Sequence, residues 1–459
     1  MSRESSSFVT FIQALRLHSS ALIALVGMTL RTLFSLCAGV FIWGCSSDQP
    51  AGVEARGVYV SHIDSLGYTL VRDGQPFPVR GASGHQDLAL LRRYGGNTVR
   101  VYEPDSLGAV LDRAAPLGIA VIADLPLPES YKASTTAADE IRRLSPELLE
   151  IVEAHHDHPA LLYWMLGNEI FNKGYAEEYV TAYNELAAGI RQIDPLHPIS
   201  STFNVHQLGY TKIRLNQPTI DFVSFNLFGN LRGLESDLWK MWPIWRGPFI
   251  LTEWSYNGPW EATNSSWGAP FEPPNATKAT HLTDRYHEWV APLYATERMM
   301  GDLAFYWGNK YESTPSWYSF FTPEGHVSEM AFALGNVWSG KEKEFPGPSV
   351  EYLLLEGAGE ATNHLLPTDS PARASVQFIT PPTPQDSFYW EIRPEDWREL
   401  GESNTILPGL FQQQSTDGAV FRTPSVPGPY RLYYRIESAD GYFSADNIPF
   451  YVLNPDDAK

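Results

Sequence analysis

The chain has 459 residues, of which 33 are Lys or Arg and 53 are Asp or Glu, so its formal net charge is −20 at pH 7. An acidic surplus of this size argues against a large phosphate-binding surface and favours neutral or cationic partners. Aromatic residues make up 13% of the chain. Most such rings pack in cores, but a content this high makes exposed rings that stack on a ligand a reasonable expectation.

Residues 1–45 have the features of a targeting segment and are set apart from the fold. Arg31 interrupts the apolar stretch 21–44, which therefore lacks an uninterrupted run of about 20 residues for a membrane span. From Met28, a candidate true start, the segment resembles a bacterial lipoprotein signal whose last residue, Cys45, is lipidated, although Trp43 replaces the usual small residue. We expect a protein anchored in the bacterial cell envelope, facing the periplasm or the exterior. An uncleaved signal anchor, with Arg31 snorkelling to the interface, is the alternative.

Cysteine and histidine content limits the chemistry of the mature protein. Cys37 and Cys45, the two cysteines, both lie in the targeting segment. The remainder therefore has no disulfide, no thiol nucleophile and no zinc site built on cysteine. His155, His156 and His158 lack the spacing of a helical ligand pair and are expected to form a turn. No Gly-rich phosphate motif or Gly-x-Ser-x-Gly elbow occurs, so we predict no metal, no cofactor and no nucleic-acid partner.

After a polar linker, residues 46–56, short apolar runs alternate with stretches of helical periodicity. Residues 68–82, YTLVRDGQPFPVRGA, predict a hairpin with its turn at Asp73-Gly74, followed by a strand. Seven further runs follow: NTVRVYEP, GIAVIADLPLP, LLYWMLGNE, HPISSTFN, IDFVSFNLF, GPFILTEW and DLAFYWGN. Helical periodicity is clear in DLALLRRYG and AEEYVTAYNELAAGIRQID. Eight strands alternating with helices predict a (β/α)8 barrel over residues 57–345.

Two carboxylates stand at predicted strand ends. Glu169 ends the run ALLYWMLGNE on the fourth strand, and Glu253 lies in FILTEW on the seventh. In such barrels the C-terminal ends of the strands form the active face, so both carboxylates are expected to face one cavity. Glycoside cleavage requires such a pair, with one acid to protonate the leaving oxygen and one nucleophile.

The segments VRGASGH, GGNTVRVY, DHPALLYWMLGNEI and FILTEWS occur in this order. Together they resemble clan A of the retaining glycoside hydrolases, most nearly the barrel domain of glycoside hydrolase family 2. A second likeness is to fungal β-1,3-glucanosyltransferases. Asp124 and Trp307 also fall where the clan has strand-end residues.

The resemblance implies that Glu169 is the general acid/base and Glu253 the nucleophile. It implies that Asn168 hydrogen-bonds the sugar 2-hydroxyl, and that Arg100 holds Glu253 ionised by lowering its pKa. Glu169 has to begin protonated, so its own pKa is expected to be raised by apolar surroundings and by the charge on Glu253.

The resemblance also implies substrate contacts for Trp307, as the floor of the subsite for the cleaved sugar, and for His85. Packing at the strand ends is the alternative for each supporting residue. One departure stands out. Where the clan commonly has a tyrosine that hydrogen-bonds the nucleophile, this chain has Phe228, whose ring cannot donate. Either Asn226 or Tyr256 is expected to substitute, or activity is lower.

The loop after the seventh strand, WSYNGPWEATNSSWGAPFEPPN, is long and rich in Trp, Pro and Asn. Long ordered loops on the active face usually shape binding. Trp254, Trp260 and Trp267 are therefore candidates to line a cleft for an extended glucan, with packing as the alternative.

Residues 348–459 alternate polar and apolar positions between Pro-Gly and Asp-Gly turns, without helical periodicity. This pattern predicts a small β-sandwich that either binds carbohydrate or braces the barrel.

These features together predict a retaining β-glycoside hydrolase or transglycosylase that acts on a β-glucan or related polysaccharide. Hydrolysis and transfer share the glycosyl-enzyme, so the sequence does not separate them. The alternative is a noncatalytic carbohydrate-binding lipoprotein on a barrel scaffold. The intact Glu169 and Glu253 favour the enzyme, and Phe228 favours the alternative.

Overall fold

A computed structural model describes residues 57–454, except for 129–133, 171–176, 204–218, 243–244 and 396–404. The predicted lipidation at Cys45, the candidate start at Met28 and the linker 46–56 lie outside the described residues. Within the described ranges, every helix is too short or too polar to cross a bilayer.

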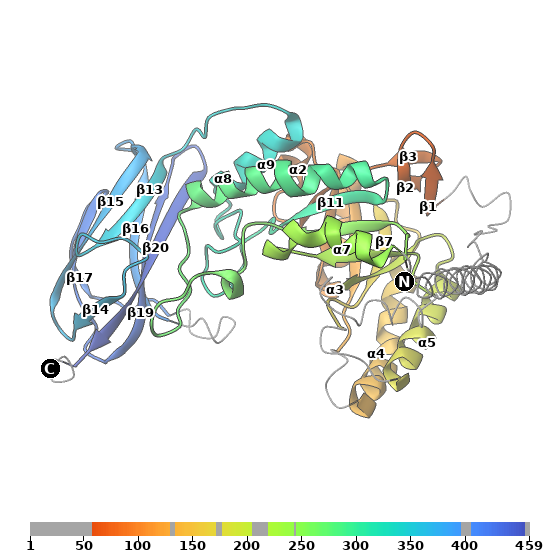
Figure 1. The fold of residues 1–459 in the computed structure, drawn as a ribbon, viewed down its shortest axis with the longest axis horizontal. Helices are drawn as coiled ribbons and strands as arrows, with labels where there is room; N and C mark the ends of the chain where they lie inside the picture. Colours follow the sequence, from red (N-terminus) through yellow and green to blue (C-terminus); the bar gives the residue numbers. More distant parts are fainter. Residues whose placement is uncertain are drawn as a thin grey trace, which may run out of the picture. The chain divides into compact units, whose positions relative to one another are not determined.

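Eight parallel strands close into a barrel, which confirms the predicted fold (Figure 1). In chain order they are β4 (Val79–Ser83), β5 (Thr98–Val101), β6 (Ala120–Leu125), β7 (Leu161–Leu166), β8 (Ile199–Phe203), β9 (Phe222–Asn226), β10 (Phe249–Trp254) and β11 (Met299–Phe305). Each strand pairs with its neighbours in the chain, and β11 pairs with β4 to close the barrel. The carboxyl ends of all eight strands therefore meet at one rim, where barrel enzymes carry their sites.

An antiparallel sheet of three strands precedes the barrel. It consists of β1 (Val58–Ile63), β2 (Gly67–Arg72) and β3 (Gln75–Phe77), and the predicted hairpin turn at Asp73-Gly74 is confirmed. The pattern analysis did not predict β1.

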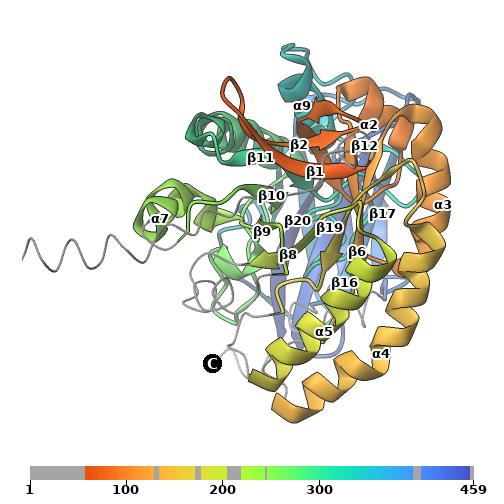
Figure 2. The same ribbon diagram turned by 90° about the vertical axis from the view of Figure 1, so that its right-hand side faces the viewer.

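Helices cover the outside of the barrel; Figure 2 shows α3, α4 and α5 in this outer layer. The α-helices are α2 (Leu88–Tyr94), α3 (Pro104–Ala114), α4 (Ser134–His155), α5 (Glu177–Ile193), α7 (Leu234–Met241), α8 (Asn275–Arg285) and α9 (Glu329–Ser339). Local chemistry sets the bounds of α2. The Asp87 side chain accepts from the Leu90 amide at 2.8 Å, and Gly95 ends the helix in the left-handed conformation. The helices predicted in DLALLRRYG and AEEYVTAYNELAAGIRQID are confirmed as α2 and α5.

The apolar run of β7 is continuous because that strand is buried on both faces. All six residues from Leu161 to Leu166 are buried. Leu162 and Met165 pack inside the barrel, whereas Trp164 and Leu166 pack in the cluster shared with the helices. Polar residues begin only at Asn168, where the strand has ended and the chain reaches the rim.

Two further sheets make up the C-terminal part, in agreement with the predicted β-sandwich (Figure 1). One contains β12 (Val327–Ser328), β14 (His364–Pro367), β16 (Ser387–Pro394), β19 (Gly428–Glu437) and β20 (Tyr442–Leu453). The other contains β13 (Ser349–Leu355), β15 (Pro371–Thr380), β17 (Phe411–Gln414) and β18 (Gly418–Arg422). The strands β13, β14 and β17 were not predicted, and β12 is contributed by the chain before α9.

A buried polar network joins the barrel segment to these sheets. Glu272 accepts hydrogen bonds from Lys278 of α8 at 2.7 Å and from Asn447 of β20 at 2.8 Å. Arg431 of β19 donates to the carbonyl oxygen of Pro270 at 2.7 Å. These contacts hold the sandwich against the barrel segment, because both sides depend on them to satisfy buried charges.

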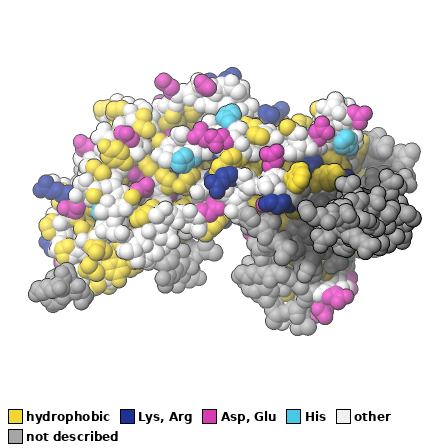
Figure 3. Space-filling view, in the orientation of Figure 1, with side chains coloured by type: hydrophobic (Ala, Val, Ile, Leu, Met, Phe, Trp, Pro, Cys, Tyr) yellow, Lys and Arg dark blue, Asp and Glu magenta, His cyan; other side chains and the backbone are white. Residues whose placement is uncertain are grey.

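Acidic and basic side chains are interspersed on the face seen in Figure 3, without an extended patch of one sign. The net negative charge therefore does not mark a binding surface on the part of that face which the structure describes.

Candidate active site

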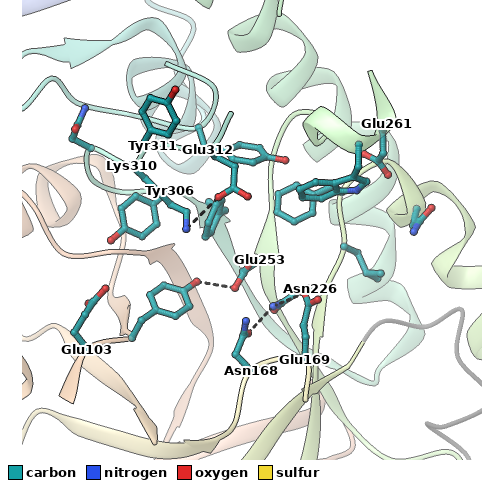
Figure 4. A pocket seen from close by; sticks show the side chains of 18 residues that line it. Glu103, Asn168, Glu169, Asn226, Glu253, Glu261, Tyr306, Lys310, Tyr311 and Glu312 are labelled. Carbon is teal, nitrogen blue, oxygen red and sulfur yellow. Dashed lines mark hydrogen bonds and ion pairs between the residues drawn. The ribbon is translucent and has the colours of Figure 1, made fainter. Parts of the chain in front are cut away.

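A pocket of about 760 Å³ opens at the carboxyl ends of the barrel strands (Figure 4). Its lining is rich in aromatic and carboxylate side chains, and ligand pockets commonly combine aromatic rings with a few precisely placed polar groups. The carboxylates in the lining are Glu103, Glu169, Glu253, Glu261 and Glu312. The aromatic residues are Tyr102, Phe228, Trp260, Phe305, Tyr306, Tyr311 and Tyr318. The structure thus brings Glu169 and Glu253 into one pocket.

Glu253 lies on β10 and is 6% exposed. Its Oε1 accepts a hydrogen bond from Arg100 Nη1 at 2.9 Å and another from the Tyr102 hydroxyl at 2.8 Å. Two donors on one oxygen fix the plane of the carboxylate, which orients Oε2 as well.

Arg100, on β5, is fully buried and links several pocket groups. It makes a bidentate pair with Asp124, at 2.9 and 2.7 Å, and also donates to Asn168 Oδ1 at 2.8 Å. Its guanidinium lies 4.4 Å from the centroid of the Tyr102 ring. Burying a guanidinium costs desolvation free energy. Charge-assisted hydrogen bonds offset this cost only when the N–H donors have acceptors, as those of Arg100 do here.

Asn168 follows β7, and its Oδ1 is a hub for donors from three other strands. Besides the bond from Arg100, it accepts from Thr202 Oγ1 at 3.1 Å and from Asn226 Nδ2 at 2.9 Å. Because an arginine side chain can only donate, the amide atom that faces it must be the oxygen. The Nδ2 amide hydrogens of Asn168 therefore point away from this hub.

Glu169 is held by two of the same groups. Asn226 Nδ2 donates to Glu169 Oε1 at 3.0 Å, and the Glu169 backbone amide donates to Thr202 Oγ1 at 2.7 Å. Its φ is 51°, in the left-handed region, two residues after Gly167 at φ 75°. A non-glycine residue in this region is unfavourable by about 1 kcal/mol, so the surrounding contacts must stabilise it. Such backbone strain is typical of functional positions.

The pKa of Glu253 is raised to about 7, mainly by burial of the carboxylate; Glu169 also raises this pKa, whereas Arg100 and the Tyr102 hydrogen bond lower it. The expected contact between Arg100 and Glu253 is therefore present, but its effect is outweighed. Arg100 does lower this pKa as expected, but it does not hold the pKa below its ordinary value, because desolvation of the carboxylate is the larger effect.

Trp307 and Trp254 do not lie in the pocket, which corrects their predicted role as substrate contacts. Trp307 is fully buried, its ring stacks on Trp338 of α9, and its Nε1 donates to the Asp87 carbonyl at 3.0 Å. Trp254 is also fully buried, and its Nε1 donates to Asp302 at 2.8 Å. Successive strand residues point to opposite faces, so Trp254 faces the helices when Glu253 faces the rim.

His85 and Tyr256 are likewise absent from the pocket lining. His85 Nδ1 lies 3.3 Å from Arg113 Nη2, and its Nε2 lies 4.0 Å from Glu103. Tyr256 stacks on His281 with ring centroids 5.5 Å apart. Neither of the two substitutes expected for the missing tyrosine donates to Glu253, since Asn226 donates to Asn168 and Glu169 instead.

Tyr102 supplies the donor that Phe228 cannot, and the pattern analysis missed it. The signal was available, because Tyr102 follows Arg100 by two residues, and alternate residues of an extended chain point to the same side. Tyr102 lies just past the last apolar residue of the run NTVRVYEP, where the alternation of the predicted strand still holds.

Of the other two tryptophans in the loop after β10, Trp260 lines the pocket and is 62% exposed. Trp267 instead packs near Tyr451 of β20, with ring centroids 5.8 Å apart. One of the three proposed cleft residues therefore reaches the pocket.

In the described part of the chain, no group of three or more His, Cys, Asp or Glu side chains is arranged to hold a metal ion. His156 and His158 lie near different carboxylates, Asp157 and Asp112, each at 3.4 Å.

No protein-family model matches the chain. A curated protein named Beta-glucuronidase, from Bacteroides fragilis, is 28% identical over 180 residues, which are 35% of this chain and 25% of that protein. A solved structure of Bacteroides uniformis beta-glucuronidase 2 has 17% identity and a TM-score of 0.48, covering 86% of this chain and 48% of its own. A putative beta-galactosidase from Bacteroides fragilis has 13% identity and a TM-score of 0.46, covering 86% and 58%. The chain thus spans a quarter of the curated relative and about half of these structures.

Proposed function

We propose that this protein is a retaining β-glycoside hydrolase or transglycosylase that acts on a β-glucan or a related polysaccharide. The observation that carries the proposal is the convergence of Glu169 and Glu253, 84 residues apart, on one pocket. The similarity to a protein named Beta-glucuronidase supports glycosidase chemistry over the matched 180 residues.

In the first step, Glu253 Oε2 attacks the anomeric carbon while Oε1 remains bound to Arg100 and Tyr102. The bond between that carbon and the leaving oxygen breaks, and Glu169 transfers its proton to this oxygen. The product is a glycosyl ester on Glu253 and a free sugar hydroxyl.

In the second step, ionised Glu169 takes a proton from water or from a sugar hydroxyl, whose oxygen attacks the anomeric carbon. The ester bond breaks, Glu253 regains its charge, and Glu169 is protonated again. Water gives hydrolysis, and a sugar hydroxyl gives transfer.

Asn168 suits the role of a donor to the sugar. Its Oδ1 accepts three hydrogen bonds, which fixes the amide so that Nδ2 is turned away from Arg100. A preorganised donor of this kind stabilises charge that develops on the sugar 2-hydroxyl oxygen in the transition state.

The proposal includes attachment to the bacterial cell envelope through a lipid on Cys45, facing the periplasm or the exterior. Metabolic labelling with a fatty acid tests this point, and Cys45→Ala is expected to abolish the label. Label that persists in the variant contradicts lipidation at this residue, and absence of label in both proteins favours the uncleaved signal anchor.

Activity is tested with linear and cyclic β-1,2-, β-1,3-, β-1,4- and β-1,6-glucans, beside a Glu253→Gln variant. Products shorter than the substrate indicate hydrolysis, and products both shorter and longer indicate transfer, provided that the variant forms neither. NMR identifies the anomer that forms first, and this tests whether the configuration at the anomeric carbon is retained. A wild type as inert as the variant on every glucan contradicts the proposal, and a glycan-binding screen then tests the noncatalytic alternative.

A further inference from the structure

Trp260 is an unusual pocket residue because its large ring is 62% exposed. Trp239 and Trp242, on and just after α7, are also exposed, at 79% and 50%, but neither lines the pocket. An exposed indole at the mouth of a polar pocket offers a flat apolar face to a ligand.

The ring of Trp260 packs against the ring of Phe228. Their centroids are 5.4 Å apart and the ring planes make an angle of 87°. Phe228 is itself 8% exposed and packs against Phe305 and Tyr318, at 5.8 and 5.1 Å. The contacts of Phe228 with Trp260 and Phe305 are edge-to-face, a favourable arrangement, so the Trp260 ring is held in place although much of it faces solvent.

The short turn that carries Trp260 is also anchored. Glu261 Oε2 accepts from the backbone amides of Gly229 and Gly258, at 2.9 and 3.0 Å. A Cβ at Gly258 would lie 2.3 Å from Cε2 of Trp260, and one at Gly229 would lie 2.7 Å from Oε1 of Glu261. A side chain at either position would therefore displace the Trp260 ring or the Glu261 carboxylate from the place it occupies here. The ring is preorganised before any ligand arrives.

The position of the turn relative to the two carboxylates indicates which part of a substrate meets the ring. In Figure 4, Glu103 and Tyr306 lie on one side of Glu253, and Glu169 and Glu261 lie on the other. The support for Trp260 also comes from the chain beside the general acid, because Phe228 is two residues from Asn226, which donates to Glu169. The acid protonates the leaving oxygen, so the leaving group lies on this side.

We propose that Trp260 is the stacking platform for the sugar on the leaving-group side of the scissile bond, which is also the place of the acceptor in transfer. This inference rests on the proposed glycosidase function and defines its substrate further. The pocket accepts a glycan that continues past the cleaved bond. It also accounts for Phe228, whose apolar ring supports the platform while Tyr102 donates to Glu253.

The test compares Trp260→Ala with wild type on two substrates, a β-gluco-oligosaccharide and β-glucosyl fluoride. Fluoride leaves nothing to stack on the platform, whereas the oligosaccharide leaves a sugar. The ratio of kcat/KM for the oligosaccharide to that for the fluoride is expected to fall by about tenfold. Trp260→Phe is expected to recover most of this loss, and Trp239→Ala, outside the pocket, serves as the matched control. A ratio that stays unchanged in Trp260→Ala overturns the inference.

A wild type that turns over neither substrate contradicts the proposed function, and direct binding then decides the inference. The affinity for the same β-gluco-oligosaccharide is measured by calorimetry for wild type and for Trp260→Ala. Binding that weakens by about tenfold in the variant supports a sugar platform without catalysis. Equal affinities, or no binding by wild type, overturn it.

Discussion

The hydroxyl of Tyr102 donates a hydrogen bond of 2.8 Å to Oε1 of Glu253, although 151 residues separate them in the chain. Arg100 donates to the same oxygen from two residues earlier, so one strand end controls the proposed nucleophile. The family resemblance placed such a tyrosine on the sixth strand, with Phe228 at the corresponding position in this chain. The missing hydroxyl at Phe228 is therefore no argument against catalysis.

Tyr102→Phe removes a hydrogen bond that lowers the pKa of Glu253, so this pKa is expected to rise above its value of about 7. A nucleophile has to be ionised, and activity therefore falls as the pH drops through the pKa of Glu253. The acidic limb of the kcat/KM profile is expected to move to higher pH in the variant, with a loss of roughly tenfold at the optimum.

Tyr256→Phe is the matched control for this profile. Tyr256 was expected from the sequence to act on the nucleophile, but it stacks on His281 outside the pocket. Its profile is expected to coincide with that of wild type. If the acidic limb moves in Tyr256→Phe and stays in place in Tyr102→Phe, Tyr102 is not the residue whose hydrogen bond lowers the pKa of Glu253.

Glu169→Gln cannot protonate the leaving oxygen. The loss in kcat/KM is expected to reach about 10²–10⁴ for a sugar leaving group. The loss in kcat/KM is expected to be much smaller for β-glucosyl fluoride, because fluoride departs with little help from an acid. Glu150→Gln, on the exposed face of α4, controls for the loss of one negative charge. Equal losses on both substrates contradict the acid role.

Arg100→Met leaves Asp124 and Glu253 buried without their shared cation. Removing one partner of a buried ion pair typically costs about 3–5 kcal/mol of unfolding free energy. The cost is expected to shrink at low pH, where the carboxyl groups are protonated. Urea unfolding at two pH values measures it. Arg142→Met, which removes an exposed pair with Glu185, is expected to cost less than about 1 kcal/mol.

Glu329, the first residue of α9, offers a pH test of stability. Burial raises its pKa to about 8, and its Oε1 accepts from Ser349 and Ser444 at 2.7 and 3.0 Å. The native state therefore favours the protonated form. Wild-type stability is expected to fall as the pH rises from about 4.5, its ordinary pKa, to about 8, by roughly 1.4 kcal/mol per unit of pKa difference.

Glu329→Gln keeps the shape of the protonated side chain without its titration. Relative to wild type, the variant is expected to gain stability as the pH rises through this range, and denaturant unfolding at several pH values measures the gain. Glu351→Gln, exposed on the neighbouring β13, serves as control. A gain that is the same at every pH contradicts burial as the cause.

Sequence periodicity by itself determined the barrel, because strands that are buried on both faces must be continuously apolar and must turn polar at the rim. The run of β7 and the polar residues from Asn168 onward are the clearest case. The same reasoning placed Glu169 and Glu253 at strand ends, and the structure brings them into one pocket. Short edge strands such as β14 and β17 escaped prediction because four residues carry too little of a pattern.

Only the tertiary structure decided which aromatic rings face the pocket. Trp307 lies two residues beyond the end of β11, where strand alternation no longer governs direction, and helix packing draws it into the core. Trp260 is exposed for the opposite reason, because Phe228 supports its ring from a separate segment and Gly258 leaves room for the ring at the rim. Alternation is a local property that a sequence displays, whereas the side of a loop that meets solvent depends on contacts between segments far apart in the chain.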